Sequence, residues 1–211
     1  MASSALVKAL NYFAALFARI AARIFYAAQW DALRTRLTAS KSAAEKLLPF
    51  DLGLIPTALV AGEDRRFFSH YGIDLYSITR ALYRAATGKS IEGASTITQQ
   101  PVRVYSGDYR YSISRKLKEI MLASLADDLL SKNDQIKLYL FRAYFGWKMN
   151  GINQATDRLG YVAPFSGKQA AEIIARLKYP EPHRPSQFQT LQIEARVNHI
   201  LELMQDDGMP R

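Results

Sequence analysis

The residues whose types and spacing could do chemistry lie in two short segments between positions 63 and 100. The first, residues 63–74, begins with two adjacent carboxylates, Glu63 and Asp64, and continues with two arginines, a Phe-Phe pair and His70. A carboxyl group beside aromatic side chains is poorly hydrated, so its pKa rises and it can exchange protons nearer neutral pH. The second segment, residues 93–100, reads Gly-Ala-Ser-Thr-Ile-Thr-Gln-Gln. It offers hydroxyl, amide and backbone N–H donors to an anionic or sugar ligand.

Each segment also has a purely structural interpretation. Glu63 and Asp64 could be the solvated end of an apolar helix, although acidic groups are unfavourable at a helix C-terminus. Ser95 and Thr96 followed by Gln99 look like a capping box, which is the commoner use of that spacing. Taken singly, either segment favours the structural interpretation.

Together, the two segments resemble the first two motifs of the peptidoglycan glycosyltransferases (glycosyltransferase family 51), roughly E-D-x-x-F-x-x-H-x-G and G-x-S-T-x-T-Q-Q. Every fixed letter of both patterns is present, and the family's R-K-x-x-E follows in order at residues 115–119. The resemblance covers roughly residues 55–207 and is strongest before residue 120. No transpeptidase-like region follows, so the chain resembles a monofunctional, divergent member.

Glycosyl transfer from a lipid pyrophosphate needs a base for the attacking hydroxyl and a set of cations or donors for the departing pyrophosphate. The resemblance implies that Glu63 is the base at the acceptor's 4-hydroxyl, and that Glu119 assists at the pyrophosphate directly or through a divalent cation. The remaining matched positions are expected to bind substrate: Asp64, Phe67, His70, Ser95, Thr96, Gln99, Gln100, Arg103, Arg115 and Lys116. No protein-held metal is expected and no cofactor is required, although Mg²⁺ or Mn²⁺ at the pyrophosphate is compatible with the resemblance.

Structural alternatives stay open for several of these residues. Arg115 and Glu119 are four apart on a predicted helix, where such a pair usually contributes only about a few tenths of a kcal/mol at the surface. His70 is as readily a capping or packing residue. Asp64 could fix the geometry of a loop without touching substrate.

The partners implied by the resemblance are lipid II, the growing glycan strand, membrane lipid and other cell-wall synthesis proteins. The implied reaction is β-1,4 glycosyl transfer with release of undecaprenyl pyrophosphate. The implied location is the bacterial inner membrane, with the catalytic domain on its extracytoplasmic face. Two alternatives remain: a lysozyme-like glycan-cleaving enzyme, and a degenerate member that binds lipid-linked precursor without turnover.

The chain departs from the family pattern at four positions. Arg103 replaces a lysine and keeps its charge in a planar, forked form, whereas Val104 replaces an amide. Further along, Lys137 replaces a carboxylate and Phe141 replaces an amide. These departures support the non-catalytic alternative, while the retention of Glu63 and Glu119 opposes it.

Composition narrows the choice of partners. The formal charge of +9 favours anionic partners such as acidic lipid or a phosphorylated substrate. No zinc-finger spacing, RNA-binding aromatic motif or isolated basic tract is present, so we expect no nucleic acid partner. The three scattered histidines and the absence of cysteine argue against a His- or Cys-based metal site.

Residues 1–30 are expected to form a membrane-associated amphipathic helix. One side collects cations and ring-bearing polar tips (Lys8, Tyr12, Ala15, Arg19, Arg23, Tyr26 and Trp30), and the other is apolar (Leu6, Leu10, Phe13, Phe17, Ile20 and Ile24). Arg19 and Arg23 would each cost about 2.5–3.5 kcal/mol at the centre of a bilayer. The pattern therefore favours a helix lying in the membrane interface over a spanning one. A helix packed on the protein's own core would show the same pattern.

The elements that must position the site are predicted to be helices, because no long run of residues alternates with period two. Residues 31–50 are expected to be a linker helix ending at Pro49, and residues 51–211 an all-α glycosyltransferase domain of lysozyme-like fold, as the resemblance implies. Helices are predicted near 56–63, 73–86, 96–104, 112–129, 133–144, 166–177 and 189–206, the last ended by Gly208. Residues 105–111 are expected to be a mobile loop. The helix from 112 is predicted to have one apolar face, formed by Ile113, Leu117, Ile120, Met121, Leu125 and Leu129.

Overall fold

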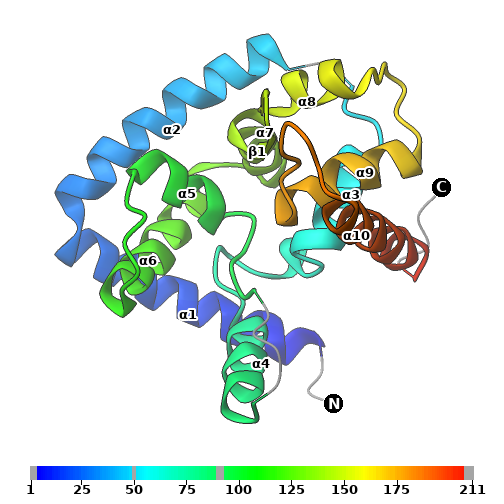
Figure 1. The fold of residues 1–211 in the computed structure, drawn as a ribbon. Helices are drawn as coiled ribbons and strands as arrows, with labels where there is room; N and C mark the ends of the chain where they lie inside the picture. Colours follow the sequence, from blue (N-terminus) through cyan, green and yellow to red (C-terminus); the bar gives the residue numbers. More distant parts are fainter. Residues whose placement is uncertain (1–3, 49–50, 89–92, 207–211) are drawn as a thin grey trace. The chain divides into compact units, whose positions relative to one another are not determined.

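The computed structural model describes residues 4–48, 51–88 and 93–206, and it is helical throughout apart from one short hairpin and connecting turns (Figure 1). The prediction of an all-α fold is therefore confirmed. The chain forms two compact units: Met1–Lys41 with Arg66–Gln135, and Ser42–Arg65 with Ile136–Arg211. Pro49 and Gly208, predicted to end two helices, lie outside the described residues. The predicted boundaries at 30 and 50 stay predictions.

The first unit contains α1 (Ser4–Phe25), most of α2 (Ala27–Leu47), the 3-10 helix η1 (Phe67–Ser69), α4 (Leu75–Ala86), α5 (Gln99–Ser106), α6 (Ile113–Leu129) and the start of α7 (Lys132–Arg142). α1 packs against α6 and α4, and α5 packs against α6. The predicted linker after residue 30 is helical, as part of α2. α2 begins at Ala27, inside the segment 1–30 that was predicted to be the first helix, because the helical conformation is interrupted at Tyr26.

Capping residues explain where these helices begin and end. The Asp74 carboxylate accepts from the backbone N–H groups of Tyr76 and Ser77 at the start of α4, and Ser112 caps α6. α5 ends at Gly107, whose φ of 67° is in the left-handed region. Pro101 is the third residue of α5, where its missing N–H breaks no helical hydrogen bond. Tyr105 is buried in the last turn of α5, so the predicted loop at 105–111 begins two residues too early.

The predicted apolar face of α6 is not the face that packs inward. Ile113 is 82% exposed and Leu117 and Leu129 are also exposed, while Leu125 alone of the predicted set is buried. The face that packs inward carries Glu119, Leu122, Ala123, Ser124, Leu125 and Ala126. The apolar pattern predicted the wrong face because two of the inward positions hold polar side chains, the Glu119 carboxylate and the Ser124 hydroxyl.

The second unit contains α3 (Ile55–Glu63), the end of α7, the strands β1 (Tyr144–Gly146) and β2 (Met149–Asn150), then α8 (Ile152–Leu159), α9 (Gly167–Lys178) and α10 (Gln187–Asp206). α3, α9 and α10 pack on one another through buried apolar side chains (Figure 1). The antiparallel hairpin and α8 were not predicted, because strands of two or three residues and a helix of eight leave too little periodicity to detect.

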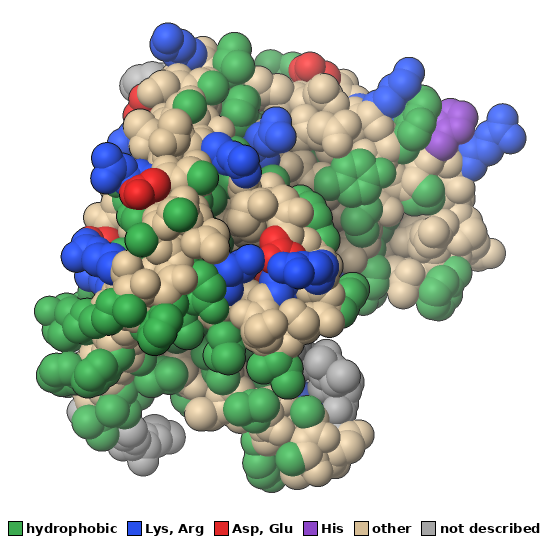
Figure 2. Space-filling model, turned by 90° about the vertical axis from the view of Figure 1, so that its left-hand side faces the viewer, with side chains coloured by type: hydrophobic (Ala, Val, Ile, Leu, Met, Phe, Trp, Pro, Cys, Tyr) green, Lys and Arg blue, Asp and Glu red, His purple; other side chains and the backbone are tan. Residues whose placement is uncertain are grey.

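The apolar side predicted for α1 is exposed, whereas on the predicted polar side Ala15 is buried and Lys8, Tyr12 and Arg23 are exposed. The buried residues of α1 include Asn11, Ala15 and Ala22, and the Arg19 guanidinium donates to the Ser124 carbonyl and pairs with Asp128 at 2.8 Å. The apolar side is exposed throughout: Leu6, Leu10, Phe13, Phe17, Ile20 and Ile24. On the face seen in Figure 2, hydrophobic side chains gather toward the lower part of the view. The segment Ala5–Phe25 is long and apolar enough to cross a membrane, and α1 also packs on its own unit.

Candidate functional site

A cluster of three cations surrounds one carboxylate in the first unit. Glu119 on α6 is 3% exposed and accepts from Lys116 at 2.6 Å and Arg115 at 2.5 Å, which lie three and four residues before it on the helix. Arg103 on α5 donates to the same carboxylate from Nε at 2.8 Å and from Nη2 at 3.1 Å. With three positive charges and one negative charge, these four side chains carry a net charge of +2.

The ionisation of this cluster follows from its burial and pairing. Burial alone would raise the pKa of Glu119, but hydrogen bonds from Arg103 and Lys116 and their charges lower it to about 2. Burial lowers the pKa of Lys116, and the charges of Arg103 and Arg115 act in the same direction, against the opposing effect of Glu119. Glu119 is therefore ionised at neutral pH and holds the three cations together.

The hydroxyl and amide segment orients these cations. The Lys116 ammonium donates to Ser95 Oγ at 2.9 Å and to Gln99 Oε1 at 2.7 Å, and Arg103 Nη2 reaches Ser95 Oγ at 3.3 Å. Gln99 in turn donates through Nε2 to the Gly72 carbonyl at 3.2 Å. The Thr96 hydroxyl also donates to that carbonyl, at 3.0 Å, and accepts from the Gln99 backbone N–H. Thr96 therefore holds the turn that precedes α5, but the predicted capping box is absent, because the N-cap residue is Thr98 and it makes no side-chain cap hydrogen bond.

Gly72 links the first motif to the second. Its φ is 83°, and a Cβ there would lie 2.6 Å from the Ala123 carbonyl oxygen of α6. Glycine is required by both the backbone conformation and this close approach. The fixed glycine of the first motif thus presents its carbonyl to Thr96 and Gln99.

The two fixed ring-bearing residues of the first motif, Phe67 and His70, are buried. Phe67 has no exposed surface, and the His70 ring lies edge-on to it and accepts through Nδ1 from the Gly72 backbone N–H. Lys132, which was not predicted as a site residue, donates to the His70 carbonyl at 2.9 Å and lies 4.4 Å from the centre of the Phe67 ring. The role of Phe67 and His70 as walls of a ligand cleft stays a prediction, and in this structure they brace the loop that carries Gly72.

Glu63 is the last residue of α3, in the second unit, and its partner is Arg196 of α10. Arg196 Nη2 donates to the Gly62 carbonyl at 2.5 Å and to Glu63 Oε1 at 3.2 Å. α3 comes close to α10 here, because a Cβ at Gly62 would lie 3.3 Å from the Ile200 side chain. Burial raises the pKa of Glu63, while the charge and hydrogen bond of Arg196 oppose the rise. A half-buried carboxylate with a raised pKa, held by one guanidinium, has the properties of a general base.

The two remaining predicted site residues, Asp64 and Gln100, lie at helix ends. Asp64 is buried at the C-terminal cap of α3, where its backbone N–H donates to the Val60 carbonyl at 3.0 Å. Gln100 is half-buried in the first turn of α5. The departures Val104, Lys137 and Phe141 are each half-buried.

The structure thus brings together Ser95, Thr96, Gln99, Arg103, Arg115, Lys116 and Glu119 in one network within the first unit, and places Glu63 and Asp64 in the second. Arg196 was not predicted. Its signal was a charge within the apolar stripe of the helix from 189 to 206, three residues after Ile193 and four before Ile200. Charged residues in such a stripe are rarely buried unless they are paired.

The residues around Glu119 do not fit a divalent cation held by the protein. Both carboxylate oxygens accept from the surrounding cations, which would repel a metal ion. Among the described residues, no group of three or more His, Cys, Asp or Glu side chains has the arrangement of a metal site.

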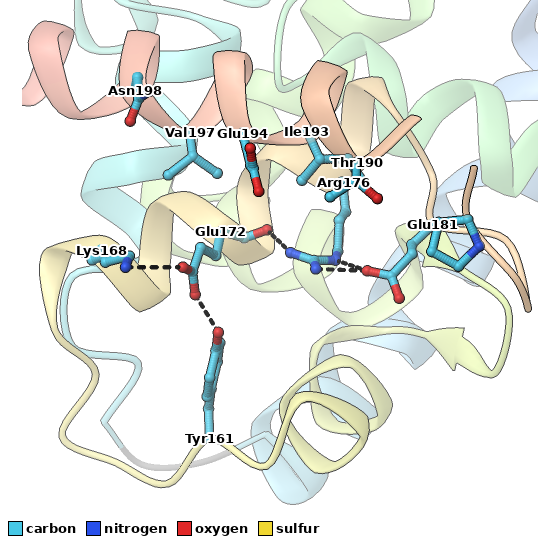
Figure 3. A pocket seen from close by; sticks show the side chains of 11 residues that line it. Tyr161, Lys168, Glu172, Arg176, Glu181, Thr190, Ile193, Glu194, Val197 and Asn198 are labelled. Carbon is cyan, nitrogen blue, oxygen red and sulfur yellow. Dashed lines mark hydrogen bonds and ion pairs between the residues drawn. The ribbon is translucent and has the colours of Figure 1, made fainter. Parts of the chain in front are cut away.

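A depression of about 480 Å³ lies beside α9 and α10 in the second unit, and none of the predicted site residues lines it (Figure 3). Glu172 pairs with Tyr161 and Lys168, and Arg176 donates to the Glu172 carbonyl and pairs with Glu181. Burial, and after it the hydrogen bond to Glu172, raises the pKa of Tyr161 to about 12. These charged groups neutralise one another, so their arrangement supports the fold more directly than ligand binding.

Comparison with known proteins places these features in a family. Residues 42–205 match the family described as "Transglycosylase". The chain is 38% identical over 160 residues to the "Monofunctional glycosyltransferase" of Staphylococcus saprophyticus, which covers 72% of this chain and 59% of that protein. It is 34% identical over 174 residues to "Penicillin-binding protein 1A" of Escherichia coli K12, which covers 78% of this chain and 20% of that protein. The chain thus spans about three fifths of one relative and one fifth of the other.

Proposed function

The chain belongs to the transglycosylase family, and from this premise we propose that it is a membrane-associated peptidoglycan glycosyltransferase that polymerises lipid II into glycan strands. The observation that carries the proposal is the cluster of Arg103, Arg115 and Lys116 around Glu119. A cluster with a net charge of +2, fixed by hydrogen bonds, suits a pyrophosphate better than a neutral glycan.

In the proposed reaction, the acceptor's 4-hydroxyl oxygen attacks the anomeric carbon of the donor sugar and gives its proton to the Glu63 carboxylate. The bond between the anomeric carbon and the pyrophosphate oxygen breaks, and undecaprenyl pyrophosphate leaves with the bonding electrons. The product is a β-1,4 linkage. The raised pKa of Glu63 makes its carboxylate a stronger base than an ordinary glutamate, and Arg196 opposes the rise.

The cation cluster would stabilise the negative charge that develops on the leaving pyrophosphate. The phosphate oxygens would replace the Glu119 carboxylate as acceptors from some of the Arg103, Arg115 and Lys116 donors. Glu119 would then act as a stand-in anion that keeps the cluster assembled between turnovers. Any Mg²⁺ or Mn²⁺ would enter bound to the phosphates, because the protein groups do not fit one.

Membrane association is proposed to depend on α1. Its exposed apolar side would lie in the membrane interface, while Arg19 ties the other side to α6. The inner membrane, with the catalytic domain on its extracytoplasmic face, is the proposed location. Contacts with other cell-wall synthesis proteins stay a prediction.

Purified full-length chain incubated with labelled lipid II, followed by separation of products by length, tests the proposal. The wild type should give a ladder of glycan strands, Glu63→Gln should give none, and Glu202→Gln, at an exposed position of α10, should match the wild type. Shortening of preformed strands would support the lysozyme-like alternative. Binding of lipid II without products would support the non-catalytic one.

A further inference from the structure

The inward side of α1 carries a buried amide. Asn11 has no exposed surface, and Ala15, Arg19 and Ala22 follow it at helical spacing on the side of α1 that packs against α4 and α6 (Figure 1). Asn11 Oδ1 accepts from the backbone N–H of Leu75 at 3.0 Å, and the two residues are 64 positions apart in the chain. α1 therefore makes a polar contact with the start of α4.

This contact completes the cap of α4. The first N–H groups of a helix have no partner within the helix itself. The Asp74 carboxylate accepts from the N–H groups of Tyr76 and Ser77, at 3.1 Å and 3.3 Å. The N–H of Leu75, the first residue of α4, is left to Asn11. The start of α4 thus depends on a side chain of another helix.

α1 also contacts the two segments that meet at Gly72. On one side, the Tyr12 ring lies edge-on to the ring of Tyr71, with 5.5 Å between their centres. On the other side, Arg19 Nε donates to the Ser124 carbonyl of α6 at 3.0 Å, one residue after the carbonyl that Gly72 approaches. α1 therefore holds both the loop that contains Gly72 and the stretch of α6 on which that loop rests.

The Gly72 carbonyl connects this loop to the cation cluster. It accepts from the Thr96 hydroxyl at 3.0 Å and from Gln99 Nε2 at 3.2 Å. Gln99 Oε1 in turn accepts from the Lys116 ammonium at 2.7 Å, and Lys116 pairs with Glu119. Hydrogen bonds tolerate only a narrow range of distances, so a shift of the loop by about 1 Å would break these contacts.

Packing alone does not explain an amide at position 11. Asn11 Nδ2 is buried and has no hydrogen-bond partner among the described residues. A buried donor without a partner is destabilising, so a leucine of similar size would pack there without that penalty. The acceptor Oδ1 is the group that gives this amide a use.

We propose that Asn11 is a positioning residue for the transfer site, and that α1 is part of the framework of the site as well as a membrane contact. The proposal rests on the proposed function, because the cluster that Asn11 positions is the proposed pyrophosphate site. Asn11 fixes Leu75 and the loop before it, and the loop presents the Gly72 carbonyl to Gln99. Loss of the acceptor at position 11 should therefore loosen a cluster that Asn11 does not touch.

Full-length variants in one detergent test this role, because membrane binding then makes no difference to the result. Asn11→Leu removes the acceptor and keeps the size, whereas Asn11→Asp keeps an acceptor and places a negative charge at the start of α4, where it is favourable. In calorimetry with inorganic pyrophosphate, Asn11→Leu should weaken affinity severalfold, up to about tenfold. Asn11→Asp should largely retain it. Phe17→Ser with Ile20→Ser, on the exposed side of the same helix, is the control and should match the wild type.

Hydrogen–deuterium exchange, resolved by peptide, gives a second readout that needs neither ligand nor turnover. Asn11→Leu should speed exchange in residues 72–78 and also in residues 95–103, while exchange in α10, which belongs to the other unit, should not change. This readout decides the role of Asn11 even if the wild type bound no pyrophosphate. That result would count against the proposed function and not against the positioning by α1.

The opposite results would overturn the proposal. Faster exchange confined to residues 72–78 would leave Asn11 as a cap of α4 only. If the wild type bound pyrophosphate and Asn11→Leu bound it equally well, the acceptor would have no effect on the cluster. Equal losses in Asn11→Leu and Asn11→Asp, or a loss of affinity in the control, would mean that any disturbance of α1 has this effect.

Discussion

Replacing Glu119 by glutamine removes the anion at the centre of the cation cluster while keeping the size of the side chain. The pKa of Glu119 is lowered from 4.5 to about 2, a difference of about 2.5 units. At about 1.36 kcal/mol per unit, ionised Glu119 contributes about 3 kcal/mol to stability at pH 7. Little of this is screened by solvent, because the residue is 3% exposed. We expect Glu119→Gln to lower the free energy of unfolding by about that amount.

The sign of the pH dependence follows from the lowered pKa. The contribution is fully present above the ordinary value of 4.5 and is lost as the pH falls through the folded value of about 2. The deficit of the variant should therefore shrink on acidification, and less than half of it should remain near pH 3.

Urea unfolding followed by circular dichroism, at pH 7 and at pH 3 in one detergent, measures both quantities. Glu202→Gln is the matched control, since that side chain is 75% exposed. A deficit under about 1 kcal/mol at pH 7, or one that is the same at both pH values, would refute the reasoning.

Three further outcomes are expected. Arg103→Ala should weaken binding of inorganic pyrophosphate, and Arg103→Lys should largely retain it; equal affinity of the alanine variant and the wild type in calorimetry would remove Arg103 from the site. Arg196→Met should shift the acidic limb of the pH–rate profile to higher pH, because Arg196 lowers the pKa of Glu63; a slower variant with an unshifted limb would leave Arg196 only a structural role. Phe17→Ser with Ile20→Ser should reduce flotation with liposomes of anionic lipid without loss of helicity, because both side chains are exposed; unchanged flotation would mean that α1 does not carry membrane binding.

The sequence predicted the helices better than their orientations. α4, α6, α9 and α10 were found because caps and apolar repeats of three and four residues are local signals. The inward face of α6 was missed because Glu119 is buried with Arg103 of α5 as a partner, and the Ser124 hydroxyl is buried while donating to the Met121 carbonyl of its own helix. Periodicity treats such residues as solvent-facing.

In the candidate site, too, the residues were found from the sequence but their tertiary contacts were not. The motifs identified Ser95, Gln99, Arg103 and Lys116 by their resemblance to a family. The Gly72 carbonyl accepts hydrogen bonds from Thr96 and Gln99, which lie more than twenty residues later in the chain. Only the tertiary fold brings these groups together, so the sequence could not show the contact. Arg196 lies 133 residues from Glu63 in the chain, so no local pattern could pair them.

The measurement that tests the central claim most directly is the stoichiometry of the reaction with lipid II. Phosphorus NMR counts the undecaprenyl pyrophosphate released, and muramidase digestion of the same sample counts the β-1,4 linkages formed. The account predicts one lipid pyrophosphate for each linkage, and neither product with Glu63→Gln. Release of pyrophosphate without linkages, or linkages formed at the wild-type rate by Glu63→Gln, would contradict it.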